Sequence, residues 1–204
     1  MICLVCNKGS FDGLTHPRCK SKYAIDGAFS AINYKGVVKK LIYNFKYKPY
    51  LSDLNKTLTE LFYESIIQNE IFQKALNSSP ADGPILVPIP LHKKRLKKRG
   101  YNHAKLLAEG VGEKLNLKVI DALERTKDTK SLFGLKLMDR KKNLKNAFTL
   151  NTKYLPAGKA GKIPNTGVLL VDDILTTGST LLEAAKILKK NGVKKVWGIT
   201  LARD

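Results

Sequence analysis

The chain has 204 residues, of which 43% are hydrophobic, and this suits one domain with a buried core together with an appendage. Its formal net charge of +20 favours polyanionic partners such as nucleic acid, an anionic membrane face or a phosphorylated small molecule, although a lysine-rich proteome would leave the same charge. No apolar run approaches the roughly 18 residues of a membrane span and no secretory signal begins the chain, so we expect a cytoplasmic protein.

All three cysteines lie within the stretch CLVCNKGSFDGLTHPRC, which begins at residue 3. Cys3 and Cys6 form one close pair, and His16 and Cys19 form another after a short loop. Two such pairs can place four ligands around one tetrahedral Zn2+, whereas the alternative is three unrelated thiols. Four protein ligands leave no open position on the metal. We therefore predict a structural zinc that supplies folding energy to a segment with little core of its own.

The next segment indicates a turn and two helices. The dipeptide Asp26–Gly27 suits a tight turn between short strands. Apolar residues at helical spacing predict one helix through VVKKLIYNF, from residue 37, and a second from Leu51 to Leu76. The turn-rich stretch NSSPADGP, residues 77–84, then predicts a linker.

From Ile85 the pattern changes to alternating strands and helices. ILVPIP is a short strand, the basic stretch LHKKRLKKRGY follows as a loop, and Asn102 caps a helix. Further strands are expected in LKVIDAL, from residue 117, at residues 168–171 and in VKKVWGITLA, from residue 193. Thr180 and Glu183 form a capping box for a helix between the last two strands. This alternation predicts an α/β fold with a parallel sheet flanked by helices.

We therefore divide the chain into three parts. Residues 1–35 form a zinc-binding module with a short hairpin, residues 36–83 form a helical linker, and residues 84–204 form the sheet domain.

The stretch VLLVDDILTTGST, Val168–Thr180, indicates a ligand site at the carboxyl end of a strand. Its carboxylates, Asp172 and Asp173, can accept hydrogen bonds from neutral hydroxyls or hold a divalent metal. The turn after them presents hydroxyls and backbone N–H groups that can hold one phosphate. Its residues are Thr176, Thr177, Gly178, Ser179 and Thr180. A ribose 5-phosphate suits both features, because its hydroxyls can face the carboxylates and its phosphate can lie in the turn. The alternative is that this stretch is an ordinary strand–turn–helix connection without a ligand.

The basic stretch carries six Lys or Arg among residues 93–99. It follows a strand's carboxyl end, which favours a ligand role over a solvated charged face. His92 and His103 flank it, and for both we expect ordinary loop and helix-start roles. The chain contains neither a G-x-x-x-x-G-K-[ST] phosphate loop nor a G-x-G-x-x-G fingerprint.

These motifs resemble those of a known family. VLLVDDILTTGST resembles the phosphoribosyl pyrophosphate (PRPP) motif of type I phosphoribosyltransferases. VPIPLHKKRLKKRGYNHA, the stretch from Arg125 to Phe148 and the N-terminal Cys/His cluster resemble segments of the ComF family of competence-associated proteins. The resemblance covers nearly the whole chain. It departs at His16, where cysteine is usual, and at Leu132, where glutamine is common.

The resemblance implies a type I phosphoribosyltransferase-like fold and a role for each motif. Asp172 and Asp173 would bind the ribose diol of PRPP, directly or through Mg2+, and Thr176–Thr180 would hold its 5-phosphate. Arg95 and Arg99 are the candidates for the pyrophosphate, with Lys93, Lys94, Lys97 and Lys98 strengthening the field. Residues 125–148 resemble a mobile loop that covers the site. The catalytic residues and the acceptor are not indicated.

Two functions of different classes follow from the resemblance. One is a PRPP-dependent phosphoribosyltransferase with a small-molecule acceptor. The other is a competence protein that binds single-stranded DNA, through residues 93–99 and 136–145, and has a protein partner in the competence machinery. Five tyrosines could add base stacking, although we expect packing roles for most of them: Tyr34, Tyr43, Tyr47, Tyr50 and Tyr101.

Overall fold

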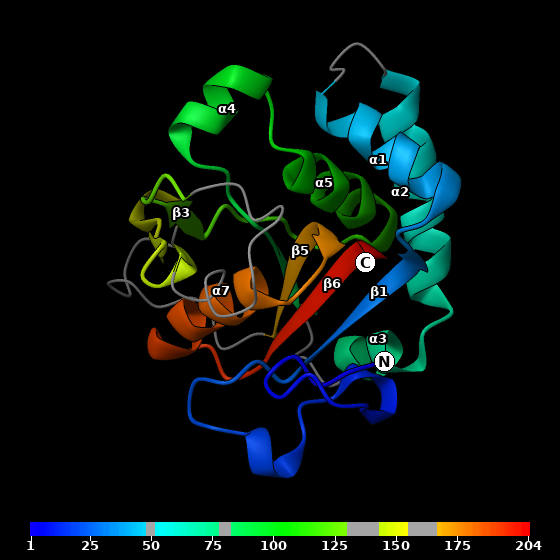
Figure 1. Ribbon diagram of the computed structural model, residues 1–204. Helices are drawn as coiled ribbons and strands as arrows, with labels where there is room; N and C mark the ends of the chain where they lie inside the picture. Colours follow the sequence, from blue (N-terminus) through cyan, green and yellow to red (C-terminus); the bar gives the residue numbers. More distant parts are fainter. Residues whose placement is uncertain (48–51, 78–82, 130–142, 155–166) are drawn as a thin grey trace.

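A four-stranded parallel sheet forms the centre of the computed structural model, which describes residues 1–47, 52–77, 83–129, 143–154 and 167–204 (Figure 1). Its strands are β1 (Gly27–Asn33), β2 (Ile85–Pro88), β5 (Val168–Leu175) and β6 (Val196–Arg203). They lie in the order β1-β6-β5-β2, and each neighbouring pair is parallel. The predicted parallel α/β fold is therefore confirmed.

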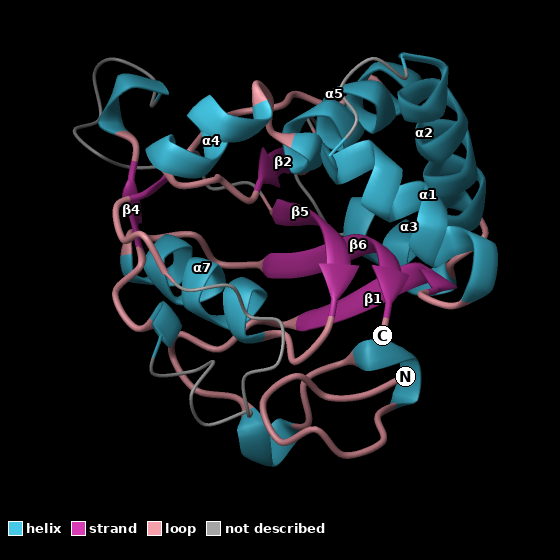
Figure 2. Cartoon of the chain, turned by 45° about the horizontal axis from the view of Figure 1, so that its top comes forward, coloured by secondary structure: helices cyan, strands magenta, loops and turns pink. Residues whose placement is uncertain are grey.

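Helices α1 (Gly36–Tyr47), α2 (Ser52–Ile67), α3 (Glu70–Asn77) and α5 (His103–Leu115) cover one face of the sheet, as Figure 2 shows. Buried side chains such as Phe62 and Leu107 fill the space between these helices and the strands. The single helix predicted from Leu51 to Leu76 is in fact two. Asn69 accepts a hydrogen bond from the backbone N–H of Phe72 at 3.1 Å, and this cap starts α3 as a separate helix.

The other face carries α7 (Ser179–Lys190), the N-terminal segment and a small antiparallel pair, β3 (Leu123–Arg125) and β4 (Phe148–Leu150). The described residues also include three short 3-10 turns: η1 (Phe11–Gly13), η2 (Pro17–Cys19) and η3 (Thr152–Tyr154). The strand predicted in LKVIDAL is wrong, because only Val119 bridges to the sheet. The chain then turns away, where the Ala122 N–H donates to the Ile120 carbonyl at 2.8 Å.

The tight turn between short strands predicted at Asp26–Gly27 is also wrong, although Ile2 and Gly9 form an isolated antiparallel bridge within residues 1–35. Gly27 begins a single strand, β1, that runs parallel to β6. Asp26 anchors it, because its carboxylate accepts from the Val196 N–H at 2.7 Å and pairs with Lys189 at 2.6 Å. A Cβ on Gly27 would lie 2.3 Å from the ring of Trp197, so glycine is required by packing rather than by a turn. The division of the chain at residues 35 and 83 stays a prediction. Strand β1 lies in the first predicted part, residues 1–35, but belongs to the central sheet.

Two helix starts also differ from prediction. The basic stretch predicted as a loop is helix α4 (Lys93–Arg99), with His92 as its N-cap and Gly100 as its left-handed end. Helix α7 begins after Gly178, so the capping box of Thr180 and Glu183 is wrong. The Glu183 carboxylate instead accepts from the Asn146 N–H at 2.9 Å.

Other expectations concern helix α5 and the connecting segments. Asn102 caps α5 as predicted, accepting from the Ala104 N–H at 3.1 Å. The predicted linker lies mostly outside the described residues, as does most of the predicted covering loop with Leu132. None of the helices in the described ranges is long and apolar enough to cross a membrane.

Candidate functional site

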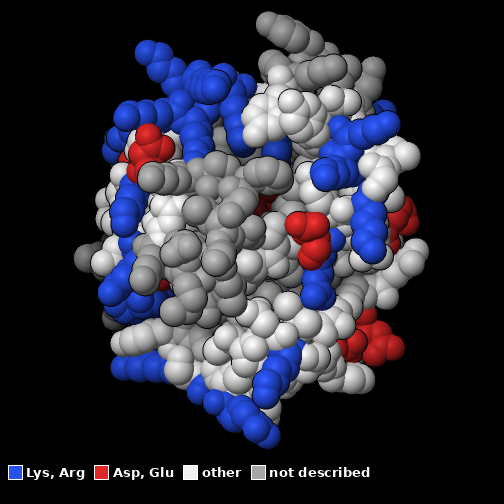
Figure 3. Space-filling view, in the orientation of Figure 1, with Lys and Arg blue, Asp and Glu red and all other residues white. Residues whose placement is uncertain are grey.

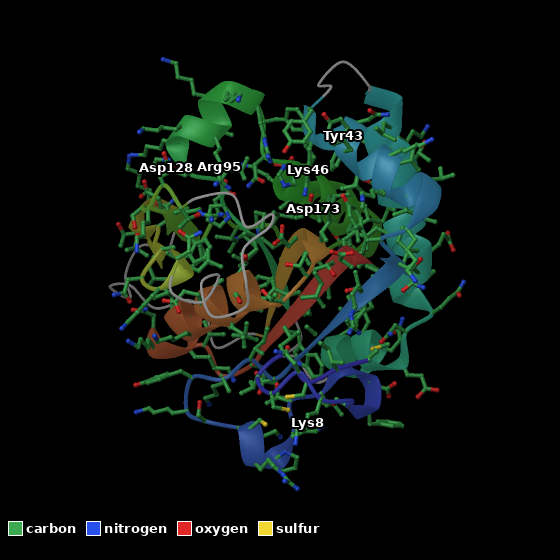
Figure 4. All side chains as sticks on the ribbon, viewed as in Figure 1. Lys8, Tyr43, Lys46, Arg95, Asp128 and Asp173 are labelled. Atoms are coloured by element: carbon green, nitrogen blue, oxygen red, sulfur yellow. The ribbon has the colours of Figure 1, made fainter. Side chains whose placement is uncertain are left out.

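The two adjacent carboxylates lie near the carboxyl end of β5, in the middle of the sheet edge. Asp173 is only 4% exposed, and its Oδ2 lies 2.6 Å from Nζ of Lys46 and 3.5 Å from Nε2 of His103. Figure 4 shows Lys46 near Asp173, reaching from α1 toward the end of β5. Asp172 is less buried, and its Oδ1 accepts from the Asp173 N–H at 2.9 Å. Three elements that lie far apart in sequence therefore converge on one acidic centre.

His103, the first residue of α5, is neutral in this centre. Burial lowers the pKa of His103 to about 4. The charge of Asp173 acts in the opposite direction, and the charge of Lys46 lowers the pKa further. Its Nδ1 lies 3.4 Å from Nη1 of Arg99, which can only donate, so Nδ1 accepts and the proton sits on Nε2, facing Asp173. At neutral pH the cation that compensates Asp173 is therefore Lys46.

The two carboxyl groups have environments that push their pKa values apart. Burial and the charge of Asp173 raise the pKa of Asp172. Burial would also raise the pKa of Asp173, but His103 and Lys46 outweigh burial and lower it. Two carboxylates this close ionise together only when a cation or several hydrogen-bond donors stabilise them. Ligand atoms of His103, Asp172 and Asp173 lie within 4.8 Å of one another, a donor set that suits a divalent cation or a vicinal diol.

The turn from Thr176 to Thr180, here called the phosphate loop, joins β5 to α7. Gly178 has φ 69° and serves as the N-cap of α7 without a side-chain hydrogen bond. The Ser179 N–H makes only a long contact of 3.5 Å with Thr177 Oγ1, so the N-terminal end of the helix can turn its backbone N–H groups to a ligand. The hydroxyls of Thr177 and Ser179 lie 2.9 Å apart. The loop therefore offers the N–H groups and hydroxyls that suit one phosphate group.

Helix α4 turns its two arginines toward the protein and its lysines toward solvent. Arg95 and Arg99 are four residues apart and half-buried on one face, whereas Lys93, Lys94, Lys97 and Lys98 are exposed. Arg99 contacts the acidic centre through His103 and donates to the Tyr47 hydroxyl at 3.3 Å. Arg95 instead donates to the backbone carbonyl of Thr129. The two predicted pyrophosphate residues therefore share a helix face but reach different sides of the site.

Arg125, at the end of β3, is a site residue that the sequence motifs do not indicate. It is 6% exposed, it donates to the Thr129 hydroxyl, and its guanidinium lies 5.5 Å from the ring centre of Phe148. Burial and the nearby charge of Arg95 lower the pKa of Arg125 to about 10, while Asp172 opposes this. Two guanidinium groups that meet at one threonine make a strong local field for an anion.

Lys46 is another site residue that the sequence motifs do not indicate. The sequence contains only weak signals for Arg125 and Lys46. Arg125 opens the stretch that resembles the ComF covering loop. Lys46 follows Phe45 in a helix whose other lysines include the exposed Lys39 and Lys40. Its half-buried position beside a core phenylalanine is the feature that sets it apart.

The N-terminal cluster brings four potential metal ligands together: Cys3, Cys6, His16 and Cys19. Their ligand atoms lie within 4.8 Å of one another, and the three cysteines are free thiols. Sγ of Cys6 lies 3.3 Å from Nδ1 of His16, while Nε2 of the same ring lies 2.9 Å from the Gly9 carbonyl. That carbonyl would fix the imidazole with Nδ1 free to bind a metal. The set fits tetrahedral Zn2+.

The outer surface of α4 continues into exposed tyrosines on α1. Figure 3 shows Lys and Arg gathered over α4 at the upper left. Tyr43 and Tyr47 are 58% and 54% exposed, their ring centres lie 4.9 Å apart, and Arg99 lies 5.0 Å from the ring centre of Tyr47. Tyr101 differs, because its hydroxyl donates to the Phe45 carbonyl and it packs within the protein. Basic side chains beside exposed aromatic rings suit a single-stranded nucleic acid.

A cavity of about 250 Å³ opens at the carboxyl ends of β1 and β6, next to Leu175 at the end of β5. Its polar lining includes Ser30, Asn33 and Arg203, and its apolar lining includes Ala28 and Ile32. The cavity is therefore a neighbour of the phosphate loop on the same edge of the sheet.

Comparisons with known proteins identify the family of this chain. Residues 96–204, more than half of the chain, match the family described as "Phosphoribosyl transferase domain". The chain belongs to this family. It is 41% identical over 120 residues to "Competence protein F" of Haemophilus influenzae, with 57% of this chain and 50% of that protein covered. It is 36% identical over 112 residues to "DNA utilization protein YhgH" of Escherichia coli, with 54% and 45% covered.

A third relative extends the match toward the N-terminus. The chain is 27% identical over 187 residues to "Competence protein ComFC" of Bacillus subtilis, with 86% of this chain and 63% of that protein covered. Together these relatives confirm membership of the ComF family. The chain spans about half the length of the Haemophilus and Escherichia proteins that it matches.

Proposed function

We propose that this protein binds PRPP together with Mg2+ at the carboxyl edge of the sheet. The observation that carries this proposal is the carboxylate pair on β5, the half-buried Asp172 and the buried Asp173, which precedes the phosphate loop in the chain. The loop takes the 5-phosphate of the ribose, and Asp172 and Asp173 accept hydrogen bonds from its 2- and 3-hydroxyls. Arg95, Arg99 and Arg125 supply the positive charge that a pyrophosphate group requires.

Magnesium fits this centre on the side of Asp172. Asp173 already has a cation, Lys46, at 2.6 Å, whereas Asp172 is free of an ion pair among the described residues. Mg2+ keeps most of its water and binds through one or two carboxylates and the phosphates of its ligand. When bound, the ion neutralises charge on the pyrophosphate. Displacement of pyrophosphate from C1 of the ribose would then be the reaction, if an acceptor is present.

We propose further that the protein acts in DNA uptake and binds single-stranded DNA. The names of its relatives refer to competence and DNA utilization. The exposed lysines of α4, with Tyr43 and Tyr47 beside them, suit phosphate contacts and base stacking. The predicted contribution of residues 136–145 concerns a stretch that lies mostly outside the described residues. A protein partner in the competence machinery and a cytoplasmic location belong to the same proposal.

A second candidate function is transfer to a small-molecule acceptor without a DNA role. The cavity beside Leu175 favours it, because Ser30, Asn33 and Arg203 offer hydrogen bonds to a polar ligand at the edge where the ribose would lie. Pyrophosphate release that depends on an added acceptor would support this function.

Calorimetric titration of PRPP with Mg2+ tests the main proposal. Replacing Asp172→Asn removes one charge-assisted hydrogen bond, typically worth about 1.5–3 kcal/mol, and should weaken binding about tenfold or more. Glu113→Gln is the matched control, because it removes an exposed carboxylate from α5 and should leave the affinity unchanged. The proposal fails if the wild-type protein does not bind PRPP, or if Asp172→Asn binds it as tightly as the wild type.

A further inference from the structure

The first turn of the Cys/His cluster lies against the phosphate loop. Leu4 stands between Cys3 and Cys6 in the sequence and is 1% exposed. A Cβ atom on Gly178 would lie 2.8 Å from Cδ2 and 3.0 Å from Cδ1 of Leu4. The Leu4 side chain therefore covers the backbone of Gly178 and occupies the space that any side chain at that position would need.

The same leucine belongs to the buried core that holds both ends of the loop. Leu4 belongs to one buried cluster with Leu175, which ends β5, and Leu181, which lies in the first turn of α7. The loop's own restraints among the described residues are local: the hydroxyl and N–H of Ser179 contact Thr177 Oγ1, the Leu182 N–H donates to the Gly178 carbonyl at 2.9 Å, and Gly178 has a left-handed φ. The packing of Leu4 consequently sets where the loop backbone lies.

We infer that Leu4 is a positioning residue for the phosphate loop, held in place by the metal-binding cluster on either side of it. The inference rests on the proposed PRPP site. When the four ligands converge on one ion, the turn from Cys3 to Cys6 is fixed and Leu4 presses on Gly178. When the four ligands do not converge on an ion, Leu4 is no longer held against Gly178 and the backbone of the phosphate loop loses this packing contact. Because coupling between two sites is reciprocal, PRPP should also make the metal harder to remove.

Substitution of Leu4 separates positioning from general stability. In zinc-loaded protein, Leu4→Ala should keep one equivalent of zinc but bind PRPP about tenfold more weakly, which is within the usual range for coupled sites. Leu4→Met should restore most of the affinity, since methionine can fill the same space. Leu188→Ala is the control, because Leu188 is fully buried in the same cluster at the far end of α7. It should lose comparable stability and keep its PRPP affinity.

Zinc removal supplies the second test. A chelator should weaken PRPP binding in the wild type and should cause no further loss in Leu4→Ala. The inference is overturned if Leu4→Ala binds PRPP like the wild type, or if Leu188→Ala loses affinity to the same extent.

If the wild type does not bind PRPP, the proposed function fails by itself. Amide hydrogen exchange of residues 176–180 then decides the inference. It should be faster in Leu4→Ala than in Leu188→Ala, and equal rates would refute the positioning role.

Discussion

The acidic centre depends on one lysine. Asp173 is buried, His103 beside it is neutral, and among the described residues Lys46 supplies the compensating charge at neutral pH. A buried carboxylate without a partner is strongly unfavourable, whereas a well-placed cation restores the balance. Burial would lower the pKa of Lys46, but Asp173 raises it, so the pair stays ionised. Lys46 thus keeps Asp173 charged, and a carboxylate accepts hydrogen bonds from hydroxyls more strongly than a neutral carboxyl group does.

Lys46→Met should therefore lower the free energy of unfolding by about 3–5 kcal/mol, the usual cost of breaking a buried pair. Adding Asp173→Asn should recover most of that loss, because it removes the uncompensated charge. Denaturant titration measures both. Lys39→Met, on the exposed side of the same helix, controls for the change in net charge. Equal stability of the single and double variants would contradict this account.

The pH dependence of stability should report on His103. Its pKa is about 4 in the folded protein and about 6.5 in an unfolded chain, so the unfolded state binds more protons between these values. Stability is full above pH 6.5 and falls as the pH drops toward 4, by up to about 3 kcal/mol from this group.

His103→Gln should remove that part of the slope. Unfolding free energies at pH 7, 6 and 5 for both proteins measure it. Because other groups titrate in the same window, the difference between the two curves is the informative quantity, and parallel curves would exclude the assigned role.

At the level of elements, helix α4 explains how one basic segment can serve two ligands. Four-residue spacing places Arg95 and Arg99 on its inner face, and the lysines face solvent. The sequence predicts a loop here because KKRLKKR contains a single apolar residue and no amphipathic period. Its helical state depends on the caps at His92 and Gly100 and on the tertiary contacts of the arginines.

Other elements show what sequence alone can and cannot determine. Strands β5 and β6 were predictable because buried parallel strands are continuous apolar runs. The grouping of four potential zinc ligands was predictable because it depends on short-range spacing. The roles of Lys46 and Arg125 could not be predicted, because they depend on packing between distant segments. This packing brings Lys46 to Asp173 and brings Arg125 and Arg95 together at Thr129. Strand β1 was interpreted as half a hairpin for the same reason, since its partner β6 is at the other end of the chain.

The two faces of α4 lead to a prediction for DNA binding. Replacing Lys94, Lys97 and Lys98 by glutamine should weaken binding of a single-stranded oligonucleotide. It should also reduce the salt dependence by about 0.7 log units per log unit of salt for each phosphate that these lysines neutralise in the wild type. PRPP affinity should change little, because the arginines remain. Fluorescence anisotropy across a salt series measures the DNA affinity.

A matched variant distinguishes this surface from net charge alone. Lys8, Lys20 and Lys22 are exposed on the N-terminal segment. Figure 4 shows Lys8 at the opposite end of the molecule from Arg95 of α4. Replacing these three by glutamine changes the charge equally and should leave DNA binding nearly intact. If both triple variants weaken binding to the same degree, the net charge of +20 is responsible rather than α4.

At the scale of the whole molecule, the site draws on nearly every part of the chain. The N-terminal cluster contributes Leu4, α1 contributes Lys46, α5 contributes His103 and β5 contributes both carboxylates. Two hydrophobic cores, one on each face of the sheet, hold these parts in register. The residues of the proposed site therefore come from all three parts of the chain that the predicted boundaries at residues 35 and 83 define.

The pairing of β1 with β6 also bears on how the protein is made. Asp26 and Val196, which join these strands at their beginnings, are 170 residues apart, and β6 lies between β1 and β5. During synthesis on the ribosome, β1 has no strand to pair with until β6 emerges. Its apolar side chains therefore stay exposed to solvent through most of synthesis. The four potential zinc ligands, in contrast, all emerge within the first 19 residues. A metal bound by these residues could therefore be acquired long before the sheet has formed.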